Sequence, residues 1–233
     1  MIKRFVLLLF FIFISFTSNA QKIDHSLWTS FLQKYVTTNG NVNYKAIKTN
    51  EAKLNTYLNQ FVKIAPQESW SKNETLAYWI NAYNAFTIKL IIDNYPIKSI
   101  KDIKNPWDKK FIPINGKMVS LNYIEHDILR KMNEPRIHFA INCASVSCPK
   151  LLNKAYLPET LDSQLDVATK TFINSENNSI KQDKLALSKI FKWFAEDFKK
   201  KGSLIDFLNN YSKTKINSNP KIVYFVYNWD LNE

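Results

Sequence analysis

The spacing of apolar residues predicts a chain built mainly from helices. In the segment 25–36, apolar side chains recur at the three- and four-residue spacing of a helix face. The pair Asn39-Gly40 then breaks this pattern, as expected of a turn. The segment 51–64 is predicted to form a second helix, which Pro66 ends.

The longest helix is predicted in the segment SKNETLAYWINAYNAFTIKLIIDNYP. Ser71 and Glu74 have the spacing of a capping box at its start, and Pro96 closes its far end. The helix should therefore span residues 73–94. Apolar residues occupy most of its circumference, which is typical of a helix that is buried on all sides.

Shorter patterns predict a hairpin, further helices and a small sheet. The pair Asn115-Gly116 joins two short extended runs and is the sequence signal of a type I′ turn, and Ser120 should cap a helix over LNYIEHDILRKM. Further helices are expected at 161–172, after Ser188 and at roughly 203–212, and strands at 184–187 and 221–231. The predicted fold class is α+β: a single helix-rich domain around a small, mostly antiparallel sheet.

The segment RIHFAINCASVSCPKL, residues 136–151, carries most of the candidate chemistry. Apolar and polar residues alternate over 136–142, which predicts a strand. On such a strand His138 and Asn142 share the polar face, whereas Cys143 leaves with the apolar face.

The two cysteines allow several interpretations. Cys148 follows a turn-prone segment that contains Ser145 and Ser147, so it can fold back towards His138 and is the better nucleophile candidate. Cys143 is the better core residue. A disulfide between the two is an alternative, because they lie five positions apart and can pair in an oxidising compartment. A zinc site is disfavoured, because the spacing matches none of the usual ligand pairs.

The predicted helices add further polar candidates. Asn81 and Asn84 lie three positions apart and share a face of the central helix. We expect this face to meet the polar face of the 136–142 strand, because a buried amide without a partner is costly. Candidate binding residues are Glu125, His126, Arg130, Asn142, Ser145 and Ser147.

Residues 1–20 have the form of a secretory signal peptide. Lys3 and Arg4 precede an uncharged apolar run that is too short to span a bilayer, and a small-x-small motif ends at Ala20. Residues 21–233 then form one domain. This organisation predicts an exported protein, periplasmic or extracellular, with no stable membrane span after cleavage.

Charge adds little to this assignment. Removing Lys3 and Arg4 lowers the formal net charge from +12 to +10, and the lysines are scattered apart from the cluster at 199–201. Such a surface is typical of solvation, with weak attraction to anionic glycans or headgroups. No segment resembles a nucleic-acid-binding module, and no motif indicates a cofactor or metal.

Several strings resemble a known family. The segments AYWINAYNAFTIKLI, YPIKSIKDI, SLNYIEHDILR, RIHFAINCASVSCPKL and AYLPETLDSQLD occur in the order found in the domain of unknown function 547. The resemblance is to bacterial, secreted members and is most specific over about 70–175. It implies no settled activity. A looser likeness, at the level of element order, is to papain-like and transglutaminase-like folds.

These observations lead to two functional hypotheses. The first is a hydrolase or transferase on an amide or glycan substrate, with His138 as base and Cys148, Asn81 and Asn84 as further catalytic candidates. The second is a non-catalytic binding or structural module of the cell envelope. In either case the expected ligand is a small molecule, a glycan or a protein of the envelope.

Overall fold

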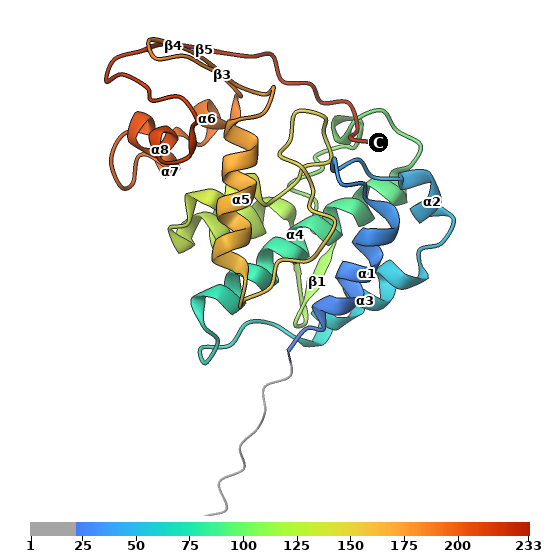
Figure 1. The fold of residues 1–233 in the computed structure, drawn as a ribbon. Helices are drawn as coiled ribbons and strands as arrows, with labels where there is room; N and C mark the ends of the chain where they lie inside the picture. The colour runs from blue at the N-terminus through green and yellow to red at the C-terminus, as the bar shows by residue number, and fades with distance from the viewer. Residues whose placement is uncertain (1–21) are drawn as a thin grey trace, which may run out of the picture.

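The computed structural model describes residues 22–233. The predicted signal peptide over 1–20 therefore lies outside the described residues. Helices surround one long central helix, and a smaller group of helices and short strands lies beside it (Figure 1). The architecture is α+β, as the sequence predicts.

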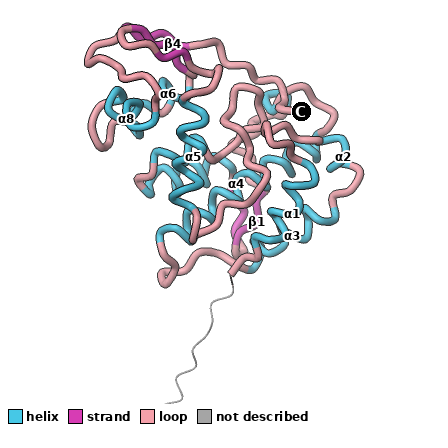
Figure 2. Tube along the Cα trace, viewed as in Figure 1, coloured by secondary structure: helices cyan, strands magenta, loops and turns pink. Residues whose placement is uncertain are grey.

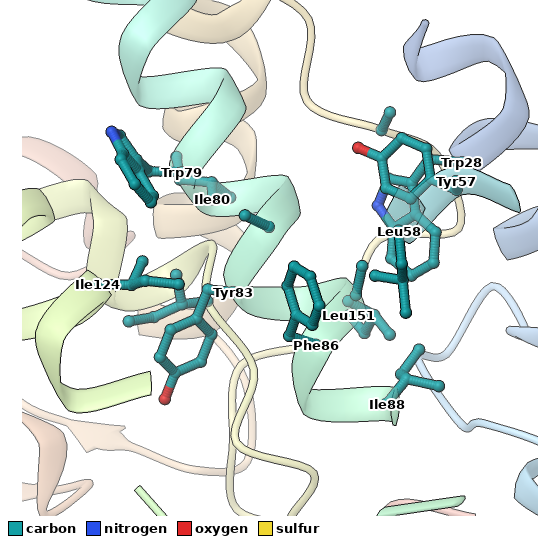
Figure 3. Close-up of a cluster of buried hydrophobic side chains, with 14 of the residues drawn as sticks. Trp28, Tyr57, Leu58, Trp79, Ile80, Tyr83, Phe86, Ile88, Ile124 and Leu151 are labelled. Carbon is teal, nitrogen blue, oxygen red and sulfur yellow. The ribbon is translucent and has the colours of Figure 1, made fainter. Parts of the chain in front are cut away.

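The central helix is α4 (Lys72–Asn94). The predicted capping box holds its start: Ser71 Oγ accepts from the N–H of Glu74, and the Glu74 carboxylate accepts from the N–H of Ser71. Trp79 and Ile88 are both buried, and Figure 3 shows them on opposite sides of the helix. The prediction of a helix that is buried nearly all round is confirmed.

Three helices at the start of the chain pack beside α4. They are α1 (His25–Tyr35), α2 (Tyr44–Lys48) and α3 (Ala52–Lys63). Trp28 of α1 stacks on Tyr57 of α3 with ring centroids 5.3 Å apart. The predicted helices at 25–36 and 51–64 are thus present, whereas the sequence analysis missed the short α2.

The hairpin follows η1 (Ile100–Asp102) and consists of β1 (Ile112–Ile114) and β2 (Lys117–Val119), paired antiparallel. Asn115 and Gly116 have φ values of 44° and 75°. Positive φ at both central positions is the requirement of a type I′ turn, so the predicted turn is confirmed.

The helix predicted after Ser120 is not a regular α-helix. Ser120 Oγ accepts from the N–H of Tyr123 at 3.1 Å, as expected of a cap. A π-helix, η2 (Tyr123–Ile128), follows and continues into a 3-10 helix, η3 (Leu129–Met132). π-Helical turns are rare in proteins, and those that occur often lie at functional sites.

The predicted strand over 136–142 is wrong. The chain instead forms a 3-10 helix, η4 (Pro135–Phe139). Ile137, His138 and Phe139 are all buried, so the alternation in the sequence does not separate a polar face from an apolar face. His138 and Asn142 therefore do not share a strand face.

The 3-10 conformation has a clear local cause. Proline occupies the first turn, where its fixed φ favours a helix, and the Glu134 side chain caps the N–H of Arg136 at 3.1 Å. The Arg136 guanidinium pairs with Glu134, Asp162 and Asp166, each at 2.7 Å. Because the last two belong to α5, these ion pairs hold η4 against that helix.

The second group of elements lies at the end of α5 (Figure 1). Its helices are α5 (Leu161–Ile173), α6 (Ile190–Trp193), α7 (Ala195–Phe198) and α8 (Leu204–Tyr211). The helix predicted after Ser188 is divided at Phe194, which separates α6 from α7.

The strands of this group are β3 (Ser179–Ile180), β4 (Lys184–Leu187) and β5 (Lys221–Tyr224). β3 pairs antiparallel with β4, and β4 pairs parallel with β5. The strand predicted over 221–231 ends at Tyr224. The remaining residues form the loop that Figure 2 shows running back towards α2, and Leu231 N–H donates to the main chain of Lys98 at 2.9 Å.

Two clusters of buried side chains form the core. The larger surrounds α4, and the smaller fills the space between α5 and α8. Trp229 packs against both clusters. The candidate site lies at this junction.

Candidate functional site

A cavity of about 220 Å³ lies where the two core clusters meet. Its lining includes the aromatic residues Trp107, Trp193, Phe194, Tyr227 and Trp229. It also includes the titratable residues Tyr83, Glu125, His126 and His138 together with Cys143 and Cys148. Convergent titratable groups in an aromatic cavity are the usual mark of a binding or active site.

His138 is held in the wall of this cavity by Asp197 and Phe194. Its Nε2 lies 2.9 Å from Asp197 Oδ2, and the same oxygen accepts from Arg130 Nε at 2.6 Å. The ring of Phe194 stacks on the imidazole with centroids 4.0 Å apart. Only 3% of His138 is exposed, so its orientation is fixed by packing as well as by hydrogen bonds.

The protonation of this pair follows from its surroundings. Burial by itself raises the pKa of Asp197, but hydrogen bonds from His138 and Arg130 outweigh it and hold that pKa well below its usual range. Burial lowers the pKa of His138, against the raising effect of Asp197. A neutral imidazole beside a carboxylate carries its proton on the nitrogen that faces the carboxylate.

The remaining nitrogen of His138 is therefore a free acceptor. Nε2 donates to Asp197, and Nδ1 is buried without a hydrogen-bond partner among the described residues. Buried polar atoms in native proteins nearly always have a partner, so an unpaired one calls for an explanation. A basic nitrogen that lacks a partner, in a residue of the cavity wall, is suited to accept a proton from a bound molecule.

Glu125 is a second unusual titratable group in the same wall. It is 7% exposed, and its carboxylate accepts from the hydroxyl of Tyr83 at 3.2 Å. Burial raises the pKa of Glu125 to about 7, although the Tyr83 hydrogen bond and the charge of Arg130 oppose this shift. Glu125 can therefore donate a proton near neutral pH, which an ordinary glutamate cannot do.

His126 lies beside Glu125 but has different contacts. Arg130 Nη1 donates to its Nδ1 at 2.8 Å, which matches the predicted shared face at a four-residue spacing. Burial and the charge of Arg130 both lower the pKa of His126. Arg130 thus joins His126 to the carboxylate that orients His138.

The asparagines of α4 are used differently from the sequence hypothesis. Asn81 donates to the main-chain oxygen of Tyr156 at 2.7 Å and accepts from its N–H at 3.0 Å. Asn84 likewise donates to the oxygen of Ala140 at 2.9 Å and accepts from the N–H of Asn142 at 2.8 Å. Each amide satisfies a main-chain donor and acceptor, and neither lines the cavity that holds His138.

Asn142 continues this support. Its side chain donates to the oxygen of Pro149 and accepts from the N–H of Ala144, both at 2.8 Å. Ala144 has a positive φ of 59°, a conformation that is costly for alanine and needs such support. Asn84 and Asn142 therefore shape the cysteine segment, which forms part of the cavity wall.

The two cysteines are joined by a disulfide, with Cα atoms 6.4 Å apart. Both line the cavity. Ser145 Oγ lies within hydrogen-bond distance of Cys148 Sγ, whereas Ser147 Oγ accepts from the N–H of Asn228 at 2.9 Å. Of the two predicted serines, only Ser145 therefore contacts the sulfur atoms.

The C-terminal segment completes the site by pairing with the cysteine loop. Val146 N–H donates to the oxygen of Asp230 at 2.9 Å, and Ser147 N–H donates to that of Asn228 at 3.2 Å. This pairing places Tyr227 beside the disulfide, where its hydroxyl lies 3.2 Å from Cys148 Sγ.

Three important residues were missed by the sequence analysis. Asp197 lies close to the lysine cluster at 199–201, and the charged residues around it are typical of a solvated helix, although aromatic residues flank it on the same face. Tyr227 and Trp229 lie in a segment whose composition predicts a strand. No pattern of spacing links these positions to His138, because they converge only in the folded chain.

The described residues include no cluster of three or more metal-ligating side chains. Among these same residues 22–233, no helix combines the length and the apolar character needed to cross a membrane.

Comparison with known proteins identifies the family. Residues 67–173 match the family described as "Protein of unknown function, DUF547", so this part of the chain belongs to that family. The matched region contains α4, Glu125, His138 and both cysteines. Neither a curated protein nor a solved structure matches the chain. Asp197 and Tyr227 lie beyond the matched region.

Proposed function

We propose that this protein is a hydrolase or transferase that acts on an amide or glycan substrate, with His138 as general base. The observation that carries the proposal is the Nδ1 of a neutral histidine in the cavity wall, which is buried and has no hydrogen-bond partner in residues 22–233. Asp197 fixes the tautomer that leaves this nitrogen free.

Glu125 supplies the complementary proton donor. Hydrolysis of an amide or glycosidic bond needs a base to remove a proton from the attacking group and an acid to protonate the leaving group. A carboxyl group with a pKa of about 7 and a neutral histidine, held in one cavity by different environments, fit these two roles. We assign Glu125 as the acid and His138 as the base.

The size and lining of the cavity suggest how a substrate is held. A volume of about 220 Å³ is less than the 300–1,000 Å³ of pockets that enclose a drug-sized ligand. It therefore suits one ring or one acyl group, with the remainder of the substrate outside. Trp193, Tyr227 and Trp229 pack on one another with centroid distances of 4.6–5.7 Å and offer rigid apolar faces to such a group.

We also propose that the protein acts outside the cytoplasm, in the periplasm or the extracellular space. Support comes from the signal-peptide pattern of residues 1–20 and from the disulfide, a bond that persists in oxidising compartments. Its ligand would then be a small molecule, a glycan or a protein of the envelope.

A non-catalytic binding module is the second candidate. The observation that favours it is the deep burial of His138 Nδ1 beneath the stacked ring of Phe194. The nitrogen would then accept a hydrogen bond from a ligand and hold it without turnover.

A panel of chromogenic probes tests the two candidates. We would measure turnover of p-nitrophenyl acetate, p-nitroacetanilide and a p-nitrophenyl N-acetylglucosaminide, and binding by quenching of the tryptophans in the cavity. A catalytic His138 predicts that His138→Gln lowers turnover per folded molecule roughly 10²-fold or more. Saturable quenching without turnover, abolished in the same variant, would instead establish the binding module.

His25 offers a matched control. It is half-buried, its Nδ1 lies 2.8 Å from the hydroxyl of Tyr57, and burial lowers its pKa to about 4. It does not line the cavity of His138. His25→Gln should therefore leave turnover unchanged, and an equal loss of turnover in both histidine variants would contradict the proposal.

A further inference from the structure

Cys148 Sγ is surrounded by hydrogen-bond donors. The N–H of Cys143 lies 3.1 Å from it, the hydroxyl of Tyr227 lies 3.2 Å from it, and the hydroxyl of Ser145 lies 3.3 Å from it. Three donors from three residues on one sulfur atom form a defined environment, which we call the sulfur cradle.

The protons available in the cradle suffice for all three bonds. Ser145 and Tyr227 each carry one hydroxyl proton, and both can point at the sulfur although the two oxygens are also 3.2 Å apart. Burial raises the pKa of Tyr227 to about 12, so its hydroxyl remains a donor at neutral pH. A disulfide sulfur is a weak acceptor, whereas a thiolate accepts strong, charge-assisted hydrogen bonds. The cradle therefore suits a thiolate better than the disulfide.

The two sulfurs differ in their surroundings. Cys148 is buried, whereas Cys143 is half-buried, and the same two hydroxyls lie 3.5 Å from Cys143 Sγ. An incoming thiolate thus reaches Cys143 more easily. Thiol–disulfide exchange is faster when the leaving sulfur is the better-stabilised thiolate, which here is Cys148.

The other titratable groups of the cavity do not oppose this charge near neutral pH. Glu125, with its pKa of about 7, is mainly neutral below that pH, and Tyr83 stays protonated because burial raises its pKa well above the usual value. His126 and His138 add no negative charge. Asp197 does not line the cavity, and the charge of its carboxylate is compensated by the Arg130 guanidinium at 2.6 Å.

We propose that the Cys143–Cys148 disulfide keeps Cys148 inactive, and that its reduction by a dithiol releases Cys148 as the nucleophile of the His138 site. This inference rests on the proposed function and narrows the substrate class from amides or glycans to amides and related acyl compounds. Cysteine is thereby assigned as a catalytic residue in addition to the acid and the base.

The redox step balances with a dithiol as the reductant. One thiolate of the dithiol attacks Cys143 Sγ, the S–S bond breaks, and its electron pair goes to Cys148 Sγ. The second thiolate of the dithiol then closes a disulfide within the reductant and releases Cys143, which takes up a proton. The dithiol has lost two protons and two electrons. Cys148 remains as the thiolate, and the second proton passes to solvent.

The acyl step uses the same groups in turn. The Cys148 thiolate attacks the carbonyl carbon of an amide, the C–N bond breaks, and Glu125 protonates the leaving amine. Water then attacks the thioester while His138 takes its proton, and the thiolate leaves with the carboxylic acid as product. The proton on His138 returns to Glu125, which restores the starting state.

The first test measures the pKa of each thiol in single-cysteine full-length chains. Cys143→Ser leaves Cys148 alone with the cradle, and Cys148→Ser leaves Cys143 as the matched control. The thiolate is titrated by its ultraviolet absorbance and by the pH dependence of alkylation with iodoacetamide. We expect the pKa of Cys148 to lie at least one unit below the ordinary value of roughly 8.5, and that of Cys143 near it.

Variants of the cradle then identify the cause. In the Cys143→Ser background, Tyr227→Phe and Ser145→Ala should each raise the pKa of Cys148. Two different positions are used so that loss of folding in one variant, detected by circular dichroism, does not decide the result. A pKa of Cys148 equal to or above that of Cys143 would overturn the inference.

A second test separates this inference from the proposed function. Reduced protein treated with p-nitrophenyl acetate should carry an acetyl group on Cys148 by mass spectrometry, and oxidised protein should not. His138→Gln should keep the low thiol pKa but accumulate the acetylated form. A low pKa with no effect of His138→Gln on deacylation would leave the reactive cysteine in place and reject His138 as base. Acetylation that is absent from Cys148 in the reduced protein would reject the nucleophile.

Discussion

His138 and Asp197 lie 59 positions apart in the chain and share a hydrogen bond of 2.9 Å, which holds His138 in the wall of the cavity. The carboxylate belongs to α7 and the imidazole to η4, so the bond links the second group of elements to the centre of the protein. This bond fixes which nitrogen of His138 is free. It is also the only hydrogen bond that the imidazole makes among the described residues.

Replacing Asp197 should reduce both stability and function. Asp197→Asn removes the charge that pairs with Arg130, and it no longer enforces the tautomer of His138. We expect a loss of about 2 kcal/mol in the free energy of unfolding, or roughly 4–8 °C in Tm. Turnover per folded molecule should fall roughly 10²-fold or more. Urea unfolding and probe turnover measure the two effects.

Glu196→Gln is the matched control for that experiment. Glu196 is the neighbour of Asp197 in the chain, but its side chain is 82% exposed and, among residues 22–233, pairs only with Lys199. Exposed ion pairs contribute little to stability, so the free energy of unfolding of Glu196→Gln should differ from that of the wild type by less than about 0.5 kcal/mol. A stability loss in Glu196→Gln as large as that of Asp197→Asn would contradict a specific role for the buried pair.

The pH dependence of stability should reveal Glu125. Its folded pKa of about 7 lies above its ordinary value of 4.5, so the folded state holds the proton more tightly. The protein should therefore lose stability as the pH rises from 4.5 to about 7, by a few kcal/mol at most, and this contribution should be constant above pH 7.

A difference measurement isolates this contribution from other titrating groups. His138 has the opposite sign, because its lowered pKa costs stability as the pH falls below its ordinary value. We would subtract the unfolding free energy of Glu125→Gln from that of the wild type at each pH. The difference should decline from pH 4.5 to pH 7. A flat difference would show that Glu125 ionises normally.

The two hydrogen bonds of the Asn84 side chain to the main chain of Ala140 and Asn142 should have a structural role. Asn84→Ala leaves the buried oxygen of Ala140 and the buried N–H of Asn142 without their partner. Each unpaired buried group costs about 1–3 kcal/mol, so we expect the free energy of unfolding to fall by about 2–4 kcal/mol. Urea unfolding of the variant and the wild type measures this loss.

Asn94→Ala provides the comparison on the same helix. Asn94 is exposed and, within the described part of the chain, its side chain donates only to the main-chain oxygen of Leu90 near the end of α4. Its loss should change stability by less than about 0.5 kcal/mol. If the two variants were equally stable, Asn84 would not hold the cysteine segment.

The predicted signal peptide can be tested directly. Expression of the full chain in a bacterium should yield an exported product that begins at Gln21, as measured by intact mass. Ala20→Arg should block cleavage, because a small residue is needed before the cleaved bond. A wild-type product that keeps Met1 and sediments with membranes would contradict the prediction.

The sequence by itself determined most of the helices and the hairpin. α4 could be predicted because a capping box, a closing proline and an apolar surface all point to one buried helix. The type I′ turn could be predicted because only a few residue pairs accept positive φ at two successive positions. Both signals are local, and they do not depend on distant parts of the chain.

The sequence also indicated His138 but assigned it to the wrong conformation. Alternation over 136–142 is the signal of a strand, yet Arg136 pairs with two carboxylates of α5 and stabilises a 3-10 helix. A segment this short has little intrinsic preference, so contacts with another element decide its conformation.

The composition of the site was decided by the tertiary structure alone. Tyr227 lines the cavity, and Asp197 contacts His138 in the cavity wall. Both come from segments that follow the cysteines by about 80 and 50 positions, and their neighbours in the sequence do not mark them as functional. Whether a histidine is a solvated side chain or a neutral base depends on burial and on the charge beside it. Those quantities arise only when the two core clusters pack together, and no local pattern of residues encodes them.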